Sequence, residues 1–297
     1  MQTTNYINTL SPAKLNLFLH ITGKRKDGYH NLQTLFRLLN WGDNMQFRLS
    51  QQTVYNDELP IRLHCNINLT DNLQDNLIVK AAHALLKNIP NNQKKTLKII
   101  DIQLNKKIPT GAGLGGGSSN AATTLLALNN LWQLEFSQQQ LQKIGVTLGA
   151  DVPIFIYGQD AIAEGVGDVF SPIKLPKQQF LLLTPSSHIS TAQLFAHPKL
   201  KRNVKKLPVA MLQKKPEHFL DTLDPSFCNV FEPVVCKLST KVTQALNYLK
   251  QFESTCNSTA RMTGSGSCVF LPLTHHTKHI DTWIKQAPCP AFFVESL

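Results

Sequence analysis

The chain has 297 residues, 42% of them hydrophobic and 16% charged, an ordinary globular balance that can bury one large domain or two modest ones. Its apolar runs are far too short to span a bilayer, and its first residues lack the charged and apolar segments of a secretory signal. None of the cysteines forms a C-x-x-C pair, which argues against a zinc knuckle or a thioredoxin-like site. We therefore expect a cytoplasmic protein with reduced cysteines and no membrane partner.

The net charge of +11 raises nucleic-acid binding as a hypothesis, but much of the excess lies in one stretch. Between Pro198 and Lys215 there is no acidic residue and no aromatic ring on which a base could stack. The basic residues there are Lys199, Lys201, Arg202, Lys205, Lys206, Lys214 and Lys215. The pattern favours a solvated, mobile segment, with attraction of an anionic substrate as the second interpretation, and we expect no nucleic-acid partner.

The first predicted element is a strand over residues 13–19 that carries two polar insertions. Side chains two residues apart point to the same face of a strand, so Lys14 and Asn16 share a face opposite their leucine neighbours. An exposed lysine is the ordinary interpretation, whereas a lysine that projects into a cleft could neutralise a transferring phosphoryl group. A polar loop follows at residues 23–30.

Later elements follow from local patterns in chain order. Apolar runs predict strands at residues 32–39, 45–49, 97–104, 161–163, 180–184 and 269–271. Helical spacing predicts three helices, each with an apolar stripe. The first begins at Asp75 and Asn76, and its stripe is Leu77, Ala81, Ala84 and Leu85. The second spans residues 118–132 with the stripe Leu125, Leu128 and Trp132, and the third has the stripe Leu141, Ile144 and Leu148. Strands and helices mix without strict alternation, which predicts an α+β fold.

A glycine-rich loop, residues 109–119, precedes the second of these helices. Glycine lets the backbone approach a ligand closely, so that successive N–H groups can converge on an anion. The loop runs into a helix start, which carries partial positive charge, and Ser118 and Ser119 add hydroxyls that can bind phosphate or Mg²⁺. This combination predicts a phosphate-binding loop rather than a flexible connector.

Two common phosphate motifs fit this loop poorly. A Walker A loop has lysine after its last glycine, where this chain has Ser118. The glycines of a dinucleotide fingerprint are formally present at Gly111, Gly113 and Gly116, but residues 108–110 intervene where the turn should be tight. The acidic residue at a suitable distance, Glu135, follows a helix and not a strand, which disfavours an oxidoreductase.

The loop over residues 113–121 resembles the second motif of the GHMP kinases, a family of galactokinases, homoserine kinases, mevalonate kinases and phosphomevalonate kinases. Its extra glycine pair is similar to the branch that acts on 4-diphosphocytidyl-2-C-methyl-D-erythritol. Five further segments resemble that branch in the same order, at residues 11–19, 23–31, 75–78, 149–155 and 262–267. The stretch from about 198 to 226 resembles nothing distinctive in the family.

The resemblance implies a two-domain GHMP kinase fold, with a ribosomal-protein-like α/β sandwich in residues 1–160 and a ferredoxin-like domain in residues 161–297. It implies transfer of a phosphoryl group from ATP, with Mg²⁺, to the 2-hydroxyl of 4-diphosphocytidyl-2-C-methyl-D-erythritol, a step of non-mevalonate isoprenoid biosynthesis. Another small alcohol as substrate is the closer alternative. An RNA-binding module is the remote one, and it would not need both Asp151 and Lys14.

The resemblance also implies roles for particular residues. Asp151 would be the catalytic base, although an aspartate beside glycine and proline is by itself more typical of a helix cap. Lys14 would be the catalytic cation, and Asn16 would bind the substrate hydroxyls. The residues implied for ATP are Pro109, Thr110, Gly111, Ala112, Gly113, Leu114, Gly115, Gly116, Gly117, Ser118 and Ser119, with Asn76 and Leu77 at the adenosine end.

The cytosine base would be met by Tyr29 and His30, with Phe195 as the opposite aromatic face and Thr191 as a polar contact. An isolated tyrosine or phenylalanine is more often a core residue, so these two roles depend on the resemblance. The chain has Ala192 where the branch often has proline, which puts the rigidity of that loop in question. Residues 264–267 would lie near the substrate phosphates or form a tight turn.

Overall fold

The computed structural model describes residues 5–53, 59–94, 96–214, 226–274 and 277–297, which form two compact units. Unit 1 comprises Met1–Ala13, Gly42–Ile108 and Gly115–Gly158, and unit 2 comprises Lys14–Trp41, Pro109–Leu114 and Gln159–Leu297. Two long strands begin in one unit and end in the other. The units are therefore not two consecutive stretches like the predicted domains 1–160 and 161–297, and that pair of boundaries stays a prediction.

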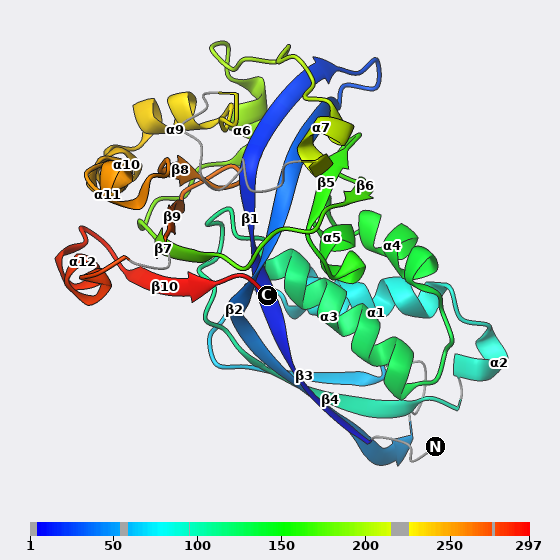
Figure 1. Cartoon of the computed structure of the whole chain (residues 1–297). Helices are drawn as coiled ribbons and strands as arrows, with labels where there is room; N and C mark the ends of the chain where they lie inside the picture. The colour runs from blue at the N-terminus through cyan, green and yellow to red at the C-terminus, as the bar shows by residue number, and fades with distance from the viewer. Residues whose placement is uncertain (1–4, 54–58, 95, 215–225, 275–276) are drawn as a thin grey trace. The chain divides into compact units, whose positions relative to one another are not determined.

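Unit 1 combines part of a sheet with a group of helices (Figure 1). Its strands are the start of β1 (Tyr6–Lys24), the end of β2 (His30–Thr53), β3 (Ile61–Cys65) and β4 (Lys98–Asn105). β4 pairs antiparallel with β2, with Asn44 opposite Asn105, and parallel with β3. The helical elements are η1 (Leu73–Asp75), α1 (Leu77–Lys87), α2 (Asn91–Lys94), α3 (Gly116–Leu131), α4 (Gln138–Val146) and α5 (Val152–Tyr157).

The helices of unit 1 begin and pack where local chemistry directs them. Ser137 and Gln140 form a capping box at the start of α4. The predicted stripe of α3 is confirmed, since Leu125, Leu128 and Trp132 are all buried. The stripe of α1 was placed slightly wrongly: its buried residues are Ile78, Val79, Ala81, Ala82 and Leu85, whereas Leu77 and Ala84 are half-buried.

Unit 2 contains the remaining strands and most of the later helices. The end of β1 and the start of β2 are followed by β5 (Ala161–Glu164) and β6 (Val169–Pro172), and a separate sheet has the order β10 (Ala291–Glu295), β7 (Gln179–Leu183), β9 (Val269–Leu273), β8 (Arg261–Met262). All neighbours in that second sheet are antiparallel. The helices are α6 (Thr191–Ala196), α7 (Val209–Lys214), α9 (Glu232–Leu238), α10 (Thr240–Lys250), α11 (Glu253–Cys256) and α12 (Ile280–Gln286).

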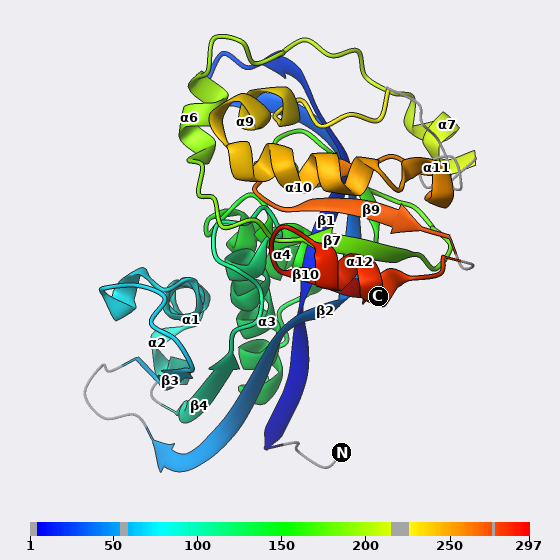
Figure 2. The ribbon, with the colours of Figure 1, turned by 90° about the vertical axis from the view of Figure 1, so that its left-hand side faces the viewer.

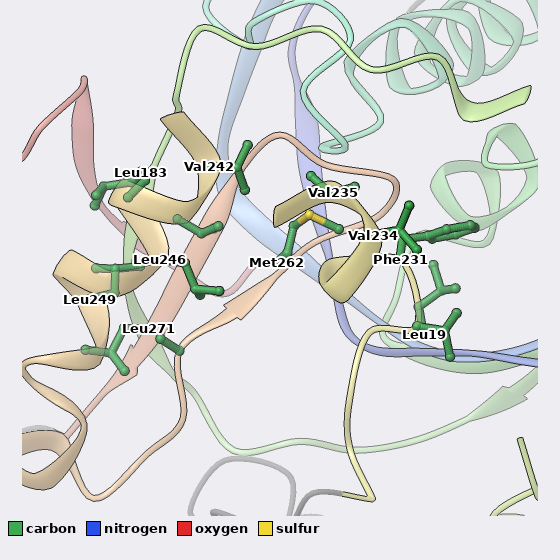
Figure 3. Packing of buried hydrophobic residues seen from close by; sticks show 14 of the residues in the cluster. Leu19, Leu183, Phe231, Val234, Val235, Val242, Leu246, Leu249, Met262 and Leu271 are labelled. Atoms are coloured by element: carbon green, nitrogen blue, oxygen red, sulfur yellow. The ribbon is translucent and has the colours of Figure 1, made fainter. Parts of the chain in front are cut away.

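The core of unit 2 lies between the second sheet and the helices that cover it. Figure 2 shows α10 lying along β9. Val242, Leu246 and Leu249 are spaced by four and three residues, so they form one buried face of α10 (Figure 3). They pack in one cluster with Leu183 of β7 and Leu271 of β9. Burial of this apolar surface, at about 25 cal/mol per Å², holds the helices on the sheet.

The strands predicted separately at residues 32–39 and 45–49 are one continuous strand, β2. The residues between them continue the strand, and there Gly42 packs directly against the backbone of β1, where a Cβ atom would overlap the carbonyl oxygen of Ser11. The sequence did not predict the strands β3, β6, β8 and β10, nor the helices α2, α6, α7, α9, α10, α11 and α12. All six cysteines are free thiols, and in the described ranges no helix has the length and apolar character to cross a membrane.

Candidate active site

The second half of the glycine-rich loop starts helix α3 in unit 1. Gly115 takes the N-cap position with φ 72° and ψ 18°, a left-handed conformation that favours glycine. The helix begins at Gly116, two residues earlier than predicted, so its first turn consists of two glycines and two serines. The first hydrogen bond of the helix runs from the Ser119 N–H to the Gly115 carbonyl over 2.8 Å, so the N–H groups of Gly116, Gly117 and Ser118 have no partner within the helix, and this end carries partial positive charge. The segment therefore has the physical features of an anion-binding site.

Ser118 and Ser119 have different surroundings in that first turn. Ser119 is buried, and its Oγ accepts a hydrogen bond of 2.8 Å from Ser11 Oγ. Ser118 is half-buried and lies beside Gly149, where a Cβ atom would be 3.7 Å from the serine Oγ. The Ser118 hydroxyl thus lies close to the segment that carries Asp151.

Asp151 occupies the N-cap position of α5, with φ −88° and ψ −7°. The helix-cap alternative is therefore correct for the backbone, but the side chain makes no capping hydrogen bond. The residues that follow, Val152 and Pro153, are buried and fix the helix start, while Asp151 itself is half-buried. The fold thus anchors this carboxylate without using it as a cap.

The residues predicted for the adenosine end lie against the same helix start. Asn76 caps α1, and its Oδ1 accepts a 2.9 Å hydrogen bond from the backbone N–H of Ile78. Leu77 faces Gly117, where a Cβ atom would be 3.1 Å from Leu77 Cδ1. Unit 1 thus brings together Asn76, Leu77 and the start of α3.

The first half of the glycine-rich loop, residues 109–114, packs in unit 2 against the small-residue loop of residues 263–268. A Cβ atom on Gly113, whose φ is +78°, would lie 2.4 Å from the carbonyl oxygen of Thr263. The backbone N–H of Cys268 donates to the carbonyl of Ala112 over 3.1 Å. The two loops therefore touch backbone to backbone, which only a glycine at position 113 permits.

Lys14 and Asn16 share a face of β1, as predicted. Lys14 is only 2% exposed, so the interpretation as an exposed strand lysine is wrong. Its Nζ donates to Asn16 Oδ1 and lies 5.5 Å from the centre of the Phe36 ring. The Asn16 amide donates to Thr34 Oγ1 over 2.8 Å, and the Asn16 backbone N–H donates to Thr263 Oγ1 over 2.9 Å. Asn16 therefore holds the ammonium group in a fixed place.

The predicted catalytic pair is divided between the units, with Asp151 in unit 1 and Lys14 in unit 2. The residues predicted for cytosine all belong to unit 2. The ring of His30, not that of Tyr29, stacks on Phe195, with centroids 4.9 Å apart and an interplanar angle of 22°. Tyr29 is 67% exposed. His30 Nε2 is buried and has no hydrogen-bond partner in the described part of the chain.

The helix that carries Phe195 also carries Thr191. Helix α6 starts at Thr191 and is capped by Ser190, so the segment with Ala192 in place of proline is an ordered helical turn. Thr191 Oγ1 donates to Ser265 Oγ over 2.9 Å, which ties α6 to the loop of residues 263–268. Thr191, the predicted polar contact for cytosine, is therefore bonded to the loop predicted to lie near the substrate phosphates or to form a tight turn.

The basic stretch is only partly a solvated segment. Its lysines from 199 to 206 are exposed, but Arg202 is half-buried. The Arg202 guanidinium donates to the carbonyls of Phe195 over 2.7 Å, His197 over 2.8 Å and Leu200 over 3.1 Å. Burial lowers the pKa of His30, and the charge of Arg202 lowers it further. Lys215, which belongs to the same stretch in sequence, lies outside the described residues.

Sequence reasoning missed three polar residues that hold these segments. They are Arg202, Asn229, whose Nδ2 donates to the carbonyls of Met262 and Gly264 over 2.8 Å each, and Asp43, which is fully buried. The alternation of side chains along β2 could have identified Asp43. Residues 43, 45 and 47 point to the same face of the strand, and Met45 and Phe47 are core residues, so Asp43 points inward as well. A carboxylate at an inward position requires partners, which predicts a polar network there.

Comparison with known proteins places these features in a family. The family model of the GHMP kinases N terminal domain matches residues 76–159. The 4-diphosphocytidyl-2-C-methyl-D-erythritol kinase of Psychrobacter cryohalolentis is 48% identical, with 99% of this chain and 98% of the relative covered. The enzyme of the same name from Acinetobacter baumannii is 44% identical, with 98% and 95% covered.

Solved structures agree with these sequence relatives. A crystal structure of 4-(cytidine 5'-diphospho)-2C-methyl-D-erythritol kinase has a TM-score of 0.74 and 28% identity, covering 98% of this chain and 99% of that one. A homoserine kinase from Cytophaga hutchinsonii has a TM-score of 0.66 at 17% identity, covering 100% and 96%, which shows the fold alone. The fold and its glycine-rich loop thus define a kinase of the GHMP class.

Within that class, the chain belongs to the 4-diphosphocytidyl-2-C-methyl-D-erythritol kinase family. This confirms the predicted α+β GHMP kinase fold and the predicted type of enzyme, an ATP-dependent kinase.

Proposed function

We propose that this kinase transfers the γ-phosphoryl group of ATP to the 2-hydroxyl of 4-diphosphocytidyl-2-C-methyl-D-erythritol. The observation that carries the proposal is the 48% identity over 99% of the chain to an enzyme of that name. The glycine-rich helix start of α3 supports it, because its N–H groups and partial positive charge suit the phosphates of ATP. Asn76 and Leu77, beside the same helix, would contact the adenosine.

Asp151 is proposed as the general base that accepts the proton of the attacking hydroxyl. A base must be held in place while its oxygens remain able to accept a proton. This role is supported by the position of Asp151, because the start of α5 fixes its backbone and the side chain is directed to a purpose other than capping that helix. The hydroxyl oxygen then attacks the γ-phosphorus, and ADP leaves.

Lys14 is proposed as the cation that stabilises charge on the transferring phosphoryl group. A buried ammonium acts more strongly than one in water, because the surrounding dielectric constant is low. Lys14 is 2% exposed and held by Asn16, which would also bind the substrate hydroxyls.

Magnesium is proposed as the ion that accompanies ATP. Mg²⁺ prefers oxygen ligands and usually takes one or two from the protein and the rest from phosphates and water. Ser118 Oγ and the neighbouring segment with Asp151 offer such oxygens, and among the residues that the structure describes no cluster of three His, Cys, Asp or Glu side chains forms a dedicated metal cage. Once bound, the ion would neutralise phosphate charge.

The cytosine base is proposed to meet Tyr29, His30, Phe195 and Thr191. A base between two rings needs two contacts of about 3.5 Å each, so it does not fit between His30 and Phe195 at 4.9 Å. We propose instead that the buried Nε2 of His30 hydrogen-bonds the base and that the exposed ring of Tyr29 stacks on it. Phe195 then supports the His30 ring from behind.

A coupled ADP-release assay tests the proposal. With ATP and Mg²⁺, the diphosphocytidyl substrate is expected to support turnover, whereas 2-C-methyl-D-erythritol 4-phosphate, which lacks the cytidine, is expected to be poor. Homoserine and mevalonate serve as alternative alcohols of the same kinase class. Faster turnover with either of them would replace the proposed substrate by another small alcohol.

A further inference from the structure

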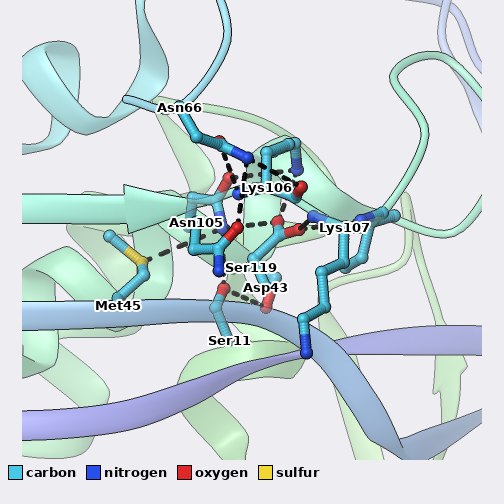
Figure 4. A network of polar contacts seen from close by, with 10 residues as sticks. Ser11, Asp43, Met45, Asn66, Asn105, Lys106, Lys107 and Ser119 are labelled. Atoms are coloured by element: carbon cyan, nitrogen blue, oxygen red, sulfur yellow. Dashed lines mark hydrogen bonds and ion pairs between the residues drawn. The ribbon is translucent and has the colours of Figure 1, made fainter. Parts of the chain in front are cut away.

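Asp43 is a fully buried carboxylate on β2 that no part of the proposed reaction uses. Burying an ionised carboxylate costs several kcal/mol unless it is paired and hydrogen-bonded. Four donors surround Asp43, all in unit 1. Figure 4 shows Asp43 within this polar network. The positions of these donors along the chain show which segments the carboxylate connects.

Two donors belong to the chain that enters the glycine-rich loop. The backbone N–H groups of Lys107 and Ile108 donate to Asp43 Oδ1 over 2.7 Å and 2.8 Å. The other oxygen, Oδ2, accepts from Lys106 Nζ, whose side chain is 4% exposed, and from Asn120 Nδ2 over 2.9 Å. Asn120 belongs to α3, the helix that follows the loop. One carboxylate therefore ties the residues before the loop to the helix after it.

The network continues to a hydroxyl of the loop itself. Asn120 Nδ2 also donates to Ser11 Oγ over 2.9 Å, and Ser11 Oγ donates to Ser119 Oγ over 2.8 Å. Lys106 Nζ donates to Asn120 Oδ1 over 3.2 Å, which fixes the orientation of that amide. Because Ser119 accepts from Ser11, its own proton is directed to a different acceptor.

The contact between the two ends of the loop is tight. A Cβ atom on Gly116, the first residue of α3, would lie 2.8 Å from Lys106 Nζ and 2.9 Å from Ile108 Cγ2. A displacement of residues 106–108 would therefore be transmitted to the first turn of α3. That turn presents the N–H groups to which the ATP phosphates are proposed to bind.

We propose that Asp43 is a positioning residue for ATP: it closes the base of the glycine-rich loop and sets the direction of the Ser119 hydroxyl. The inference rests on the proposed function, since it takes the triphosphate of ATP as the ligand of the loop. Asp43 contributes to ATP affinity through the geometry of α3 and Ser119, not by contact with the nucleotide.

The test is ATP binding to Asp43→Asn, measured by calorimetry. An amide has one acceptor and one donor group, so it must turn a donor toward either Lys106 and Asn120 or the two backbone N–H groups. Losing hydrogen bonds of this charged type predicts a rise in Kd for ATP of about tenfold to hundredfold. The KM of the alcohol substrate is expected to change little.

A second substitution restores the contact between the two ends of the loop. In Asp43→Asn with Asn120→Asp, the amide at 43 can accept from the backbone N–H groups and donate to the carboxylate at 120, which also accepts from Lys106. Ser11 then donates its one proton to that carboxylate and no longer to Ser119. This double variant is therefore expected to recover part of the ATP affinity, the part that depends on the position of residues 106–108 against α3. The double variant keeps one buried carboxylate beside Lys106, so its ATP affinity can be measured even if Asp43→Asn alone does not fold.

Asp160→Asn is the matched control. Like Asp43, Asp160 is a carboxylate paired with a buried cationic side chain. It accepts from Arg37 Nη1 over 2.6 Å and from the Leu38 N–H over 3.0 Å. Its loss is expected to lower Tm without changing Kd for ATP. Unchanged Kd in folded Asp43→Asn overturns the inference, as does a double variant that recovers Tm but none of the lost ATP affinity. If the parent enzyme itself fails to bind ATP, the proposed function fails first.

Discussion

Gly113→Ala probes the backbone contact between the two small-residue loops of unit 2. At this position a Cβ atom would stand 2.4 Å from the Thr263 carbonyl oxygen and 2.9 Å from that of Gly266. Both neighbours are backbone atoms, so a rotamer change does not relieve the overlap. The native φ of +78° also lies in the left-handed region, which a residue with a Cβ atom adopts only at a cost.

These two costs can be separated with a matched variant. Gly28 has a similar φ of +88°, but a Cβ atom there meets nothing within 4 Å. Gly28→Ala therefore carries the conformational cost alone, about 1–2 kcal/mol. Gly113→Ala adds the overlap, for which overpacking of a tight site gives about 1–3 kcal/mol more in the free energy of unfolding.

Thermal unfolding of the parent and both variants measures the difference. At about 2–4 °C per kcal/mol, Gly113→Ala is expected to melt roughly 2–12 °C below Gly28→Ala. The two carbonyls must move apart to admit the methyl group, and the 3.1 Å hydrogen bond from Cys268 N–H to Ala112 weakens with them. Equal melting temperatures for the two variants would show that a Cβ atom at position 113 does not disturb the contact between the two loops, which would refute the argument.

Three further substitutions test the proposed roles. Asp151→Asn should lower turnover by about 10²–10⁴-fold with little change in ATP affinity, in a coupled assay with calorimetry, and near-normal turnover would remove Asp151 as the base. Phe195→Ala should raise KM for the diphosphocytidyl substrate about two- to tenfold, since it removes the support of the His30 ring and so weakens a proposed hydrogen bond of about 0.5–1.5 kcal/mol to the base, and equal losses with a substrate lacking cytidine would contradict the role in base recognition. Arg202→Met should raise both that KM and the pKa of His30 followed by NMR, because a nearby positive charge is removed, and an unchanged His30 pKa would disprove the coupling.

The His30 shift also predicts the sign of a pH effect. Its pKa is lowered in the folded enzyme, so the unfolded chain binds the proton more readily at low pH. The contribution of His30 to stability is therefore present above its ordinary pKa and is lost as the pH falls. A His30→Gln variant should show a smaller loss of Tm between neutral and mildly acidic pH than the parent, and an equal loss would contradict the assignment.

The sequence alone determined what depends on neighbours along the chain. The glycines and serines of residues 111–119 imposed a loop that enters a helix, because backbone freedom and helix-end charge are local properties. Asn76 likewise began α1, since its side chain caps an N–H two residues away. The side chains of Lys14 and Asn16 were predicted on one face because strand geometry repeats every two residues.

Only the tertiary structure decided which distant segments meet. No local pattern shows that Asp43 joins residues 106–108 to Asn120, that Gly113 touches the carbonyl of Thr263, or that His30 rather than Tyr29 stacks on Phe195. The sequence likewise assigned Arg202 to a solvated stretch, whereas the fold brings its guanidinium to the end of α6. These contacts join residues far apart along the chain, and their geometry is fixed by the packing of whole strands and helices, which pattern and propensity within a short window do not determine.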